Sequence, residues 1–181
     1  MITVRKFCFL AIVLITSCSD DDEKSVTLLD DDFDNSPGWQ YTSTANHVGT
    51  LDAVEFSSPQ QSLKIKALDT QANGFSFWSQ QIMAVSFPEK AKLILRAKVK
   101  TQDVTGEGVF VALRCDSNTT QLSFETTQGT TMINGSNEFT EYTVNMSAIP
   151  KGTTNMWVFL IMSGTCTGEA YFDDVSLVYK W

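Results

Sequence analysis

The sequence predicts an all-β protein, a two-sheet antiparallel jelly-roll β-sandwich preceded by a signal peptide. Alternation is clearest at residues 91–100, where Leu93, Leu95, Ala97 and Val99 interleave with mostly charged residues. A period of two indicates a strand with one buried face. Beyond the signal peptide, no window longer than a few residues has a convincing helical stripe. Many short strands with turns at regular spacing are typical of sandwiches and jelly rolls.

The other alternating runs and their turns follow the same pattern. The expected strands are 62–68, 74–85, 91–100, 108–115, 121–125, 138–147, 155–163 and 169–179. Turn signals between them include Pro88-Glu89-Lys90, Gly106-Glu107-Gly108, Asn134-Gly135-Ser136, Pro150-Lys151-Gly152 and Gly164-Thr165. We find no internal repeat.

The N-terminus predicts an exported precursor. Residues 1–17 carry Arg5 and Lys6, then an apolar stretch of about nine residues. A membrane-spanning helix needs roughly 20 such residues, so this segment is a signal peptide and not an anchor helix. We therefore divide the chain into a signal peptide (1–17), an acidic tether (18–25) and one β-sandwich domain (26–181).

The end of the signal peptide, Ile15-Thr16-Ser17-Cys18, resembles the lipobox of bacterial lipoproteins. The resemblance implies that Cys18 is acylated and becomes the first residue of the mature chain. The alternative is an ordinary signal peptide with an incidental cysteine. The acidic run at 19–23 resembles a signal that carries some lipoproteins to the cell surface; alternatively, it is a solvated linker. The expected location is the cell envelope, as an outer-membrane lipoprotein exposed at the surface.

Charge limits the partners. Removing residues 1–17 takes two of the 13 basic residues and none of the 21 acidic ones, which changes the formal net charge from −8 to −10. This charge argues against nucleic acid or anionic lipid as a partner, so we expect membrane contact only through the lipid anchor. We expect a monomer.

The last strand carries a family resemblance. Residues 168–177, Gly-Glu-Ala-Tyr-Phe-Asp-Asp-Val-Ser-Leu, resemble the closing strand of carbohydrate-binding-module-like jelly rolls of the galactose-binding-like group. Segments at 80–82, 92–100, 112–116, 139–142 and 159–164 match in order. The resemblance implies one sheet from strands near 74–85, 107–115, 119–125 and 155–163, and a second from 62–68, 91–100, 138–147 and 168–179. Members of the group bind sugars or serve as spacers, so the fold does not fix the function.

The candidate ligand-binding residues come from strand parity in the first of these sheets. With Val111, Leu113, Val158, Leu160 and Met162 in the core, the opposite face carries Phe110, Ala112, Arg114, Trp157, Phe159 and Ile161. Aromatic rings stack on sugar rings, and an arginine donates to hydroxyl groups. Trp78 is a further candidate, although its register is ambiguous by one residue. Alternatively, loops or segment 35–60 cover this face and make it a second small core.

The resemblance also implies a structural calcium ion, because related modules hold one at one end of the sandwich. The candidate ligands are Asp32, Asp34 and Asp173, with Asp31 beside them; hard carboxylate oxygens suit calcium. In the alternative, Asp173 and Asp174 only accept backbone hydrogen bonds at a strand bulge, and the cluster at 30–34 is solvated.

Cys115 and Cys166 are the cysteines of the domain, and an even count in an oxidising compartment favours a disulfide. The expected topology places them at opposite ends of neighbouring strands, roughly 20 Å apart, so we predict two unpaired thiols.

We expect no catalytic activity. The single histidine, His47, falls in a loop-like stretch, and a carboxylate pair such as Glu125 with Asp116 arises by chance in any acidic β protein. The favoured function is therefore binding of a glycan or a peptide. The alternative is a structural role in an envelope complex, with a partner protein docked on the apolar face.

Overall fold

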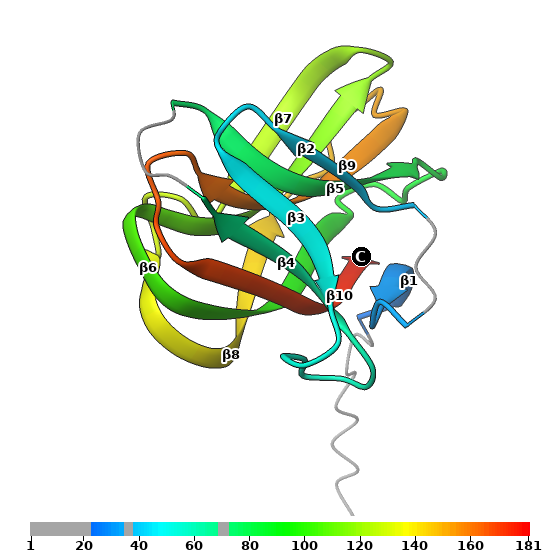
Figure 1. The fold of residues 1–181 in the computed structure, drawn as a ribbon. Helices are drawn as coiled ribbons and strands as arrows, with labels where there is room; N and C mark the ends of the chain where they lie inside the picture. The colour runs from blue at the N-terminus through cyan, green and yellow to red at the C-terminus, as the bar shows by residue number, and fades with distance from the viewer. Residues whose placement is uncertain (1–22, 35–37, 69–72) are drawn as a thin grey trace, which may run out of the picture.

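The computed structural model describes residues 23–34, 38–68 and 73–181. The signal peptide, Cys18 and most of the acidic tether lie outside these ranges. Every regular element in them is a β-strand (Figure 1). The strands are β1 (Ser25–Asp31), β2 (Gln40–Ser43), β3 (His47–Asp52), β4 (Ser62–Ala67), β5 (Phe75–Met83), β6 (Lys92–Ser117), β7 (Thr120–Thr126), β8 (Ile133–Met146), β9 (Asn155–Ser163) and β10 (Glu169–Lys180). No helix capable of crossing a membrane occurs in the described residues.

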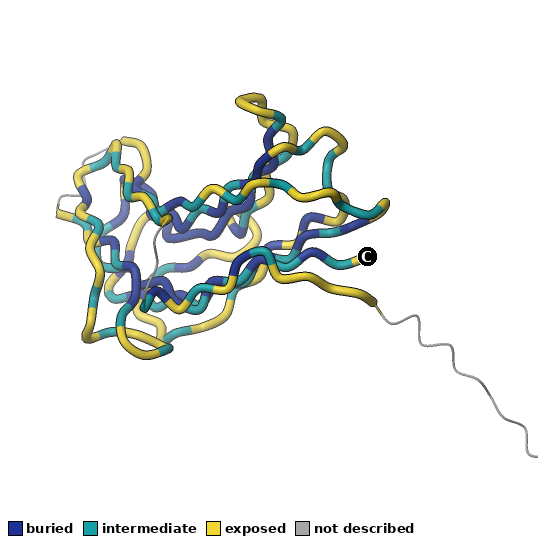
Figure 2. Tube along the Cα trace, turned by 90° about the vertical axis from the view of Figure 1, so that its right-hand side faces the viewer, coloured by how far each residue is buried: buried dark blue, intermediate teal, exposed yellow. Residues whose placement is uncertain are grey.

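The strands form two antiparallel sheets, which Figure 2 shows as two layers with the buried residues between them. Sheet one has the order β3-β4-β10-β6-β8, and β1 continues beside the second half of β10. Sheet two has the order β2-β5-β9-β6-β7. This arrangement confirms the predicted antiparallel sandwich and the predicted division of strands between its sheets.

Strand β6 belongs to both sheets. Its first half pairs with β10 from Lys92 to Gln102, and its second half pairs with β9 from Val109 to Asp116. The strand bends between these halves, where Gly108 has a φ of +87°. A Cβ atom at Gly108 would lie 2.7 Å from the carbonyl oxygen of Ile133, so a larger residue does not fit there. The sequence predicted a turn at this point; the chain instead continues as one bent strand.

The core lies between the sheets and is built largely by β6. Leu93, Leu95, Ala97 and Val99 are fully buried, as their alternation with charged residues predicted. The second half of β6 continues the pattern with Val111, Leu113 and Cys115. Each of them lies opposite a buried residue of β9 in the ladder.

Both domain cysteines are buried and unpaired, which confirms the prediction. Cys115 lies opposite Met156 in the ladder, whereas Cys166 lies at the other end of β9, where the Gly108 N–H donates to its Sγ at 3.0 Å. Burial raises the pKa of both thiols.

The segment before residue 60 differs most from expectation. His47 does not lie in a loop; it begins β3, and its side chain is buried. Strands β2 and β3 each extend one sheet at its edge, by pairing with β5 and β4. Residues 38–60 therefore lie beside the sheets and over sheet one, and they do not cover the outer face of sheet two.

Candidate functional site

The outer face of sheet two, which we call the aromatic face, holds most of the predicted ligand-binding residues. The registers of β5, β9 and β6 set them in rows across the strands. One row is Phe77, Ile161 and Phe110, and another contains Trp157 and Arg114. Because residues directly opposite in a ladder point to the same side, these side chains share one face.

The aromatic face is part small core and part open surface. Phe110, Ala112 and Ile161 are buried beneath their neighbours Phe77 and Phe159, whose rings meet edge to face at 5.6 Å. At the rim, Phe75 is 43% exposed and Phe124 is 41% exposed. These rings, with Arg114 and Gln128, line a hollow of about 340 Å³. The rings of Phe77 and Phe159 thus cover a small apolar cluster, while those of Phe75 and Phe124 leave apolar surface open to solvent.

Arg114 is held in a fixed position on this face. Its Nε and Nη2 donate to Asp116 Oδ2 at 3.1 and 2.9 Å. The guanidinium lies over the rings of Phe159 and Trp157, with Cζ 5.2 and 5.8 Å from their centroids. These two rings are stacked, with centroids 6.1 Å apart. An arginine fixed in this way is preorganised to donate its remaining N–H groups to a ligand beside the rings.

Two buried acceptors lie beyond Arg114, at the end of the face nearest β1. Asp116 and Asn155 are opposite one another in the ladder, and both are almost fully buried. Asn155 Nδ2 donates to the carbonyl of Asn118, but neither Asn155 Oδ1 nor Asp116 Oδ1 has a partner among the described residues. Buried oxygens in this state accept from ordered water or from a ligand.

Trp78 is the predicted residue that the structure separates from the others. It lies opposite Leu160, a core residue, so its side chain points between the sheets. Its Nε1 donates to the carbonyl of Lys64 at 3.1 Å, and its ring packs against Tyr41. The ambiguous register of β5 thus resolves with Phe75 and Phe77 on the aromatic face, two residues that the sequence reasoning did not select. Strict alternation of Phe75 and Phe77 with Ser76 was the signal that could have identified them.

The three predicted calcium ligands are not brought together. No three acidic, histidine or cysteine side chains converge in the described part of the chain. Asp173 is fully buried, and its oxygens accept from the N–H groups of Ser57, Ser58 and Asp174 and from the Ser58 hydroxyl. Burial raises the pKa of Asp173.

Asp32 and Asp34 each accept a backbone hydrogen bond. Asp32 accepts from the N–H of Asp34, and Asp34 accepts from the N–H of Gln60. Calcium stays a prediction: an unfolding midpoint that rises with calcium and falls with a chelator would support it.

The carboxylates considered for hydrolysis do not form a pair. Asp116 is bound to Arg114 on the aromatic face, whereas Glu125 lies opposite Leu113, which faces the core. Their strand parities place the two carboxylates on opposite sides of sheet two.

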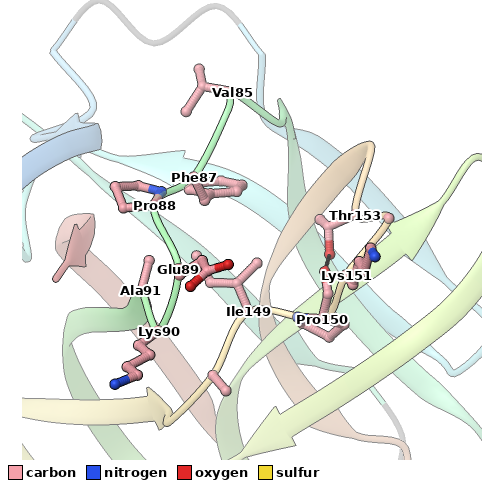
Figure 3. A pocket seen from close by; sticks show the side chains of 12 residues that line it. Val85, Phe87, Pro88, Glu89, Lys90, Ala91, Ile149, Pro150, Lys151 and Thr153 are labelled. Atoms are coloured by element: carbon pink, nitrogen blue, oxygen red, sulfur yellow. Dashed lines mark hydrogen bonds between the residues drawn. The ribbon is translucent and has the colours of Figure 1, made fainter.

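A larger hollow of about 430 Å³ lies at one end of the sandwich, between loops 84–91 and 147–153 (Figure 3). The Ile149 N–H donates to the carbonyl of Ala91 at 3.0 Å and ties the two loops together. Phe87 belongs to the lining, but its ring packs edge-on against Tyr179 at 5.2 Å. The hollow is lined by loops with charged side chains at Glu89, Lys90 and Lys151, and Phe87 is the one aromatic residue in its described lining. The aromatic face therefore remains the candidate site.

No protein-family model matches the sequence, and no curated protein matches it. Solved structures share the fold at low sequence identity. A cyclase from Fischerella sp. TAU is 16% identical with a TM-score of 0.63, over 86% of this chain and 98% of that one.

Two xylan-related structures also match. The CBM22-1 xylan-binding domain from Paenibacillus barcinonensis Xyn10C is 12% identical with a TM-score of 0.52, over 84% of this chain and 94% of that one. The CBM22-1-GH10 modules of a Clostridium thermocellum xylanase, complexed with xylohexaose, are 20% identical with a TM-score of 0.56; the match covers 84% of this chain and 28% of that one. At these identities the comparisons establish a shared β-sandwich fold.

Proposed function

We propose that this chain is a lipid-anchored binding module whose aromatic face takes a carbohydrate, without catalysing a reaction. The observation that carries the proposal is the fixed Arg114 above the stacked rings of Trp157 and Phe159. The C–H face of a pyranose ring packs on such rings, and its hydroxyl oxygens accept from the arginine. The xylan-binding neighbour and the xylohexaose complex support this ligand class.

The charges on the aromatic face favour a neutral sugar. Asp116 neutralises Arg114, and the mature chain as a whole is acidic. An acidic polysaccharide would therefore meet repulsion that a neutral one avoids. Arg114 is the sole ionisable side chain lining the hollow within the described residues, and the carboxylate beside it, Asp116, is bound to its guanidinium. This lining supports a binding role over general acid–base chemistry.

The test is a titration of residues 19–181, which contain every strand, with xylohexaose and other neutral oligosaccharides. Trp157→Ala removes one ring of the stacked pair, and we expect a loss of affinity of about tenfold, near 1.4 kcal/mol. Trp181→Ala is the matched control, because this exposed tryptophan stacks on Tyr179 instead. Equal losses of affinity in the two variants, or an unchanged affinity in Trp157→Ala, would contradict the assignment of the site.

The lipid anchor has its own test. We expect a clickable palmitate analogue to label the expressed precursor, and Cys18→Ala to abolish the label. Cys8→Ala is the control, because this cysteine lies inside the expected signal peptide. Digestion of intact cells with a protease tests surface exposure, and a chain that stays protected would contradict it.

A protein partner is the second candidate, favoured by the exposed rim. Phe75, Leu122 and Phe124 lie on strands β5 and β7 with large apolar side chains in solvent. An assembly role predicts that a specific envelope protein co-purifies with the wild type and not with Phe75→Ser/Phe124→Ser. Binding of neutral oligosaccharides would instead favour the carbohydrate role.

A further inference from the structure

A separate hollow, which we call the side cleft, opens between the two sheets. It has a volume of about 150 Å³ and is lined by Phe33, Trp39, Leu51, Gln61, Leu63 and Trp78. Trp78 on β5 belongs to sheet two, whereas Leu51 and Leu63 on β3 and β4 belong to sheet one. The side cleft therefore lies on the core side of sheet two, and the aromatic face lies on the other side.

The exposure of Leu51 shows that the sandwich is open here. Leu51 lies opposite Leu63, which is buried in the core, so its side chain points inward. It is nevertheless 54% exposed. Two residues earlier, the ring of Tyr41 closes the space, because a Cβ at Gly49 would lie 2.3 Å from it. The sheets thus meet at Gly49 and part at Leu51.

The walls of the side cleft are largely apolar. Trp39 Nε1 donates to Asp31 Oδ2 at 2.9 Å, and Trp78 Nε1 donates to the carbonyl of Lys64 at 3.1 Å. Both indole N–H groups are thus satisfied by the protein. The Phe33 ring meets the Trp39 ring edge to face, with centroids 5.4 Å apart. None of the lining residues is charged.

One polar atom remains for an occupant. Gln61 Nε2 donates to the carbonyl of Phe33 at 2.7 Å, and Gln61 Oε1 has no hydrogen-bond partner in the ranges described. A ligand hydroxyl can donate to this oxygen. The lining offers no comparable acceptor for further hydroxyls, which disfavours a sugar because each buried unpaired hydroxyl is costly.

We propose that the side cleft is a second binding site, for a single uncharged aromatic ring of the phenol type. An apolar cavity of about 150 Å³ is large enough to bind benzene. The ring packs among Trp39, Trp78 and Leu51, and its hydroxyl donates to Gln61 Oε1. This site is independent of carbohydrate binding on the aromatic face.

The probe is p-cresol, added to the mature chain while NMR records the four indole N–H signals. We expect saturable shifts at Trp39 and Trp78, and none at Trp157 or Trp181. Toluene, which has the same ring but no hydroxyl, should bind at least threefold more weakly. Shifts centred on Trp157 would place p-cresol on the aromatic face and overturn the proposal, as would shifts that never saturate.

Leu51→Phe fills the side cleft with a ring of its own, and we expect at least tenfold weaker p-cresol binding. Val54→Phe is the matched control, because Val54 is exposed and does not line the side cleft. Equal affinity in the two variants would overturn the proposal. Oligosaccharide binding should be unchanged in both, so failure here is distinguishable from failure of the carbohydrate role.

Discussion

The outer faces of the two sheets are built on different principles. On sheet one the charged side chains form ion pairs: Lys64 pairs with Glu169 at 2.6 Å, and Lys100 pairs with Glu55 at 2.8 Å. On sheet two, rings occupy the corresponding positions, with one arginine among them. Sheet one also carries a cover, since the loop after β3 folds over it, while the aromatic face has none of its own among the described residues.

This contrast indicates where the molecule has capacity for a ligand. The polar groups on sheet one are satisfied by the chain itself, and an added ligand would have to displace them. The aromatic face exposes apolar area and one preorganised donor, so a ligand gains contacts without breaking any. The ion-paired outer face of sheet one is thus a structural feature, and the exposed apolar surface of the aromatic face is the candidate for function.

The largest expected effect compares the two sides of sheet two. Leu113→Ala opens a cavity in the core, and we expect the free energy of unfolding to fall by about 3 kcal/mol. Phe159→Ala, on the aromatic face, should cost only about 1 kcal/mol because that side chain is partly exposed. Urea denaturation measures both. Equal losses would mean that the aromatic face is a second core and not a binding surface.

A smaller effect is expected when the cover of sheet one is released. Asp173→Asn replaces a buried acceptor with an amide whose NH₂ opposes the N–H donors of Ser57 and Ser58. We expect a loss of about 2 kcal/mol in urea denaturation. Asp174→Asn is the control: its carboxylate is partly exposed and pairs with Lys98, so we expect less than about 1 kcal/mol. A larger loss in the control would show that the ion pair, and not Asp173, holds the loop.

The smallest effect is a pH dependence confined to sheet one. Partial burial alone would raise the pKa of Glu169, but hydrogen bonds from Lys64, Lys66 and Tyr171 lower it from 4.5 to about 2. A carboxylate with a depressed pKa stabilises the folded state above pH 4.5, and this stabilisation disappears as the pH falls through 2.

Glu169→Gln should therefore be less stable than the wild type at neutral pH, by under about 1 kcal/mol because the pair is screened by solvent. The difference should vanish near pH 2. Denaturant unfolding at several pH values measures it, and a difference that persists in acid would show that packing, and not charge, is responsible.

Local pattern predicted the strands well where one face is buried and the other charged. The alternation around Leu95 located β6 and its register, because a one-residue slip would bury lysines. The face on which Trp78 lies could not be predicted, for the converse reason. Strand β5 has apolar or aromatic residues on both faces, so neither register is penalised. The partners of Asp173 were also beyond prediction, since Ser57 and Ser58 lie more than a hundred residues away in sequence.

The open side cleft could not be anticipated at all. Leu51 looks like any inward residue of an edge strand, and its exposure depends on the shape of the strands opposite. Even the existence of β2 and β3 was missed, because each is short and gains its stability from the sheet it joins.

The N-terminal strand has a mechanical consequence. β1 runs antiparallel to the end of β10, and the Lys24 N–H and carbonyl pair with Trp181 just before it. A pull directed along β1, against a load held on the sandwich, strains the hydrogen bonds of its ladder together, as shear, instead of opening them one after another. With the tether proposed at Cys18, such a domain would resist detachment better than one whose first strand could be peeled away.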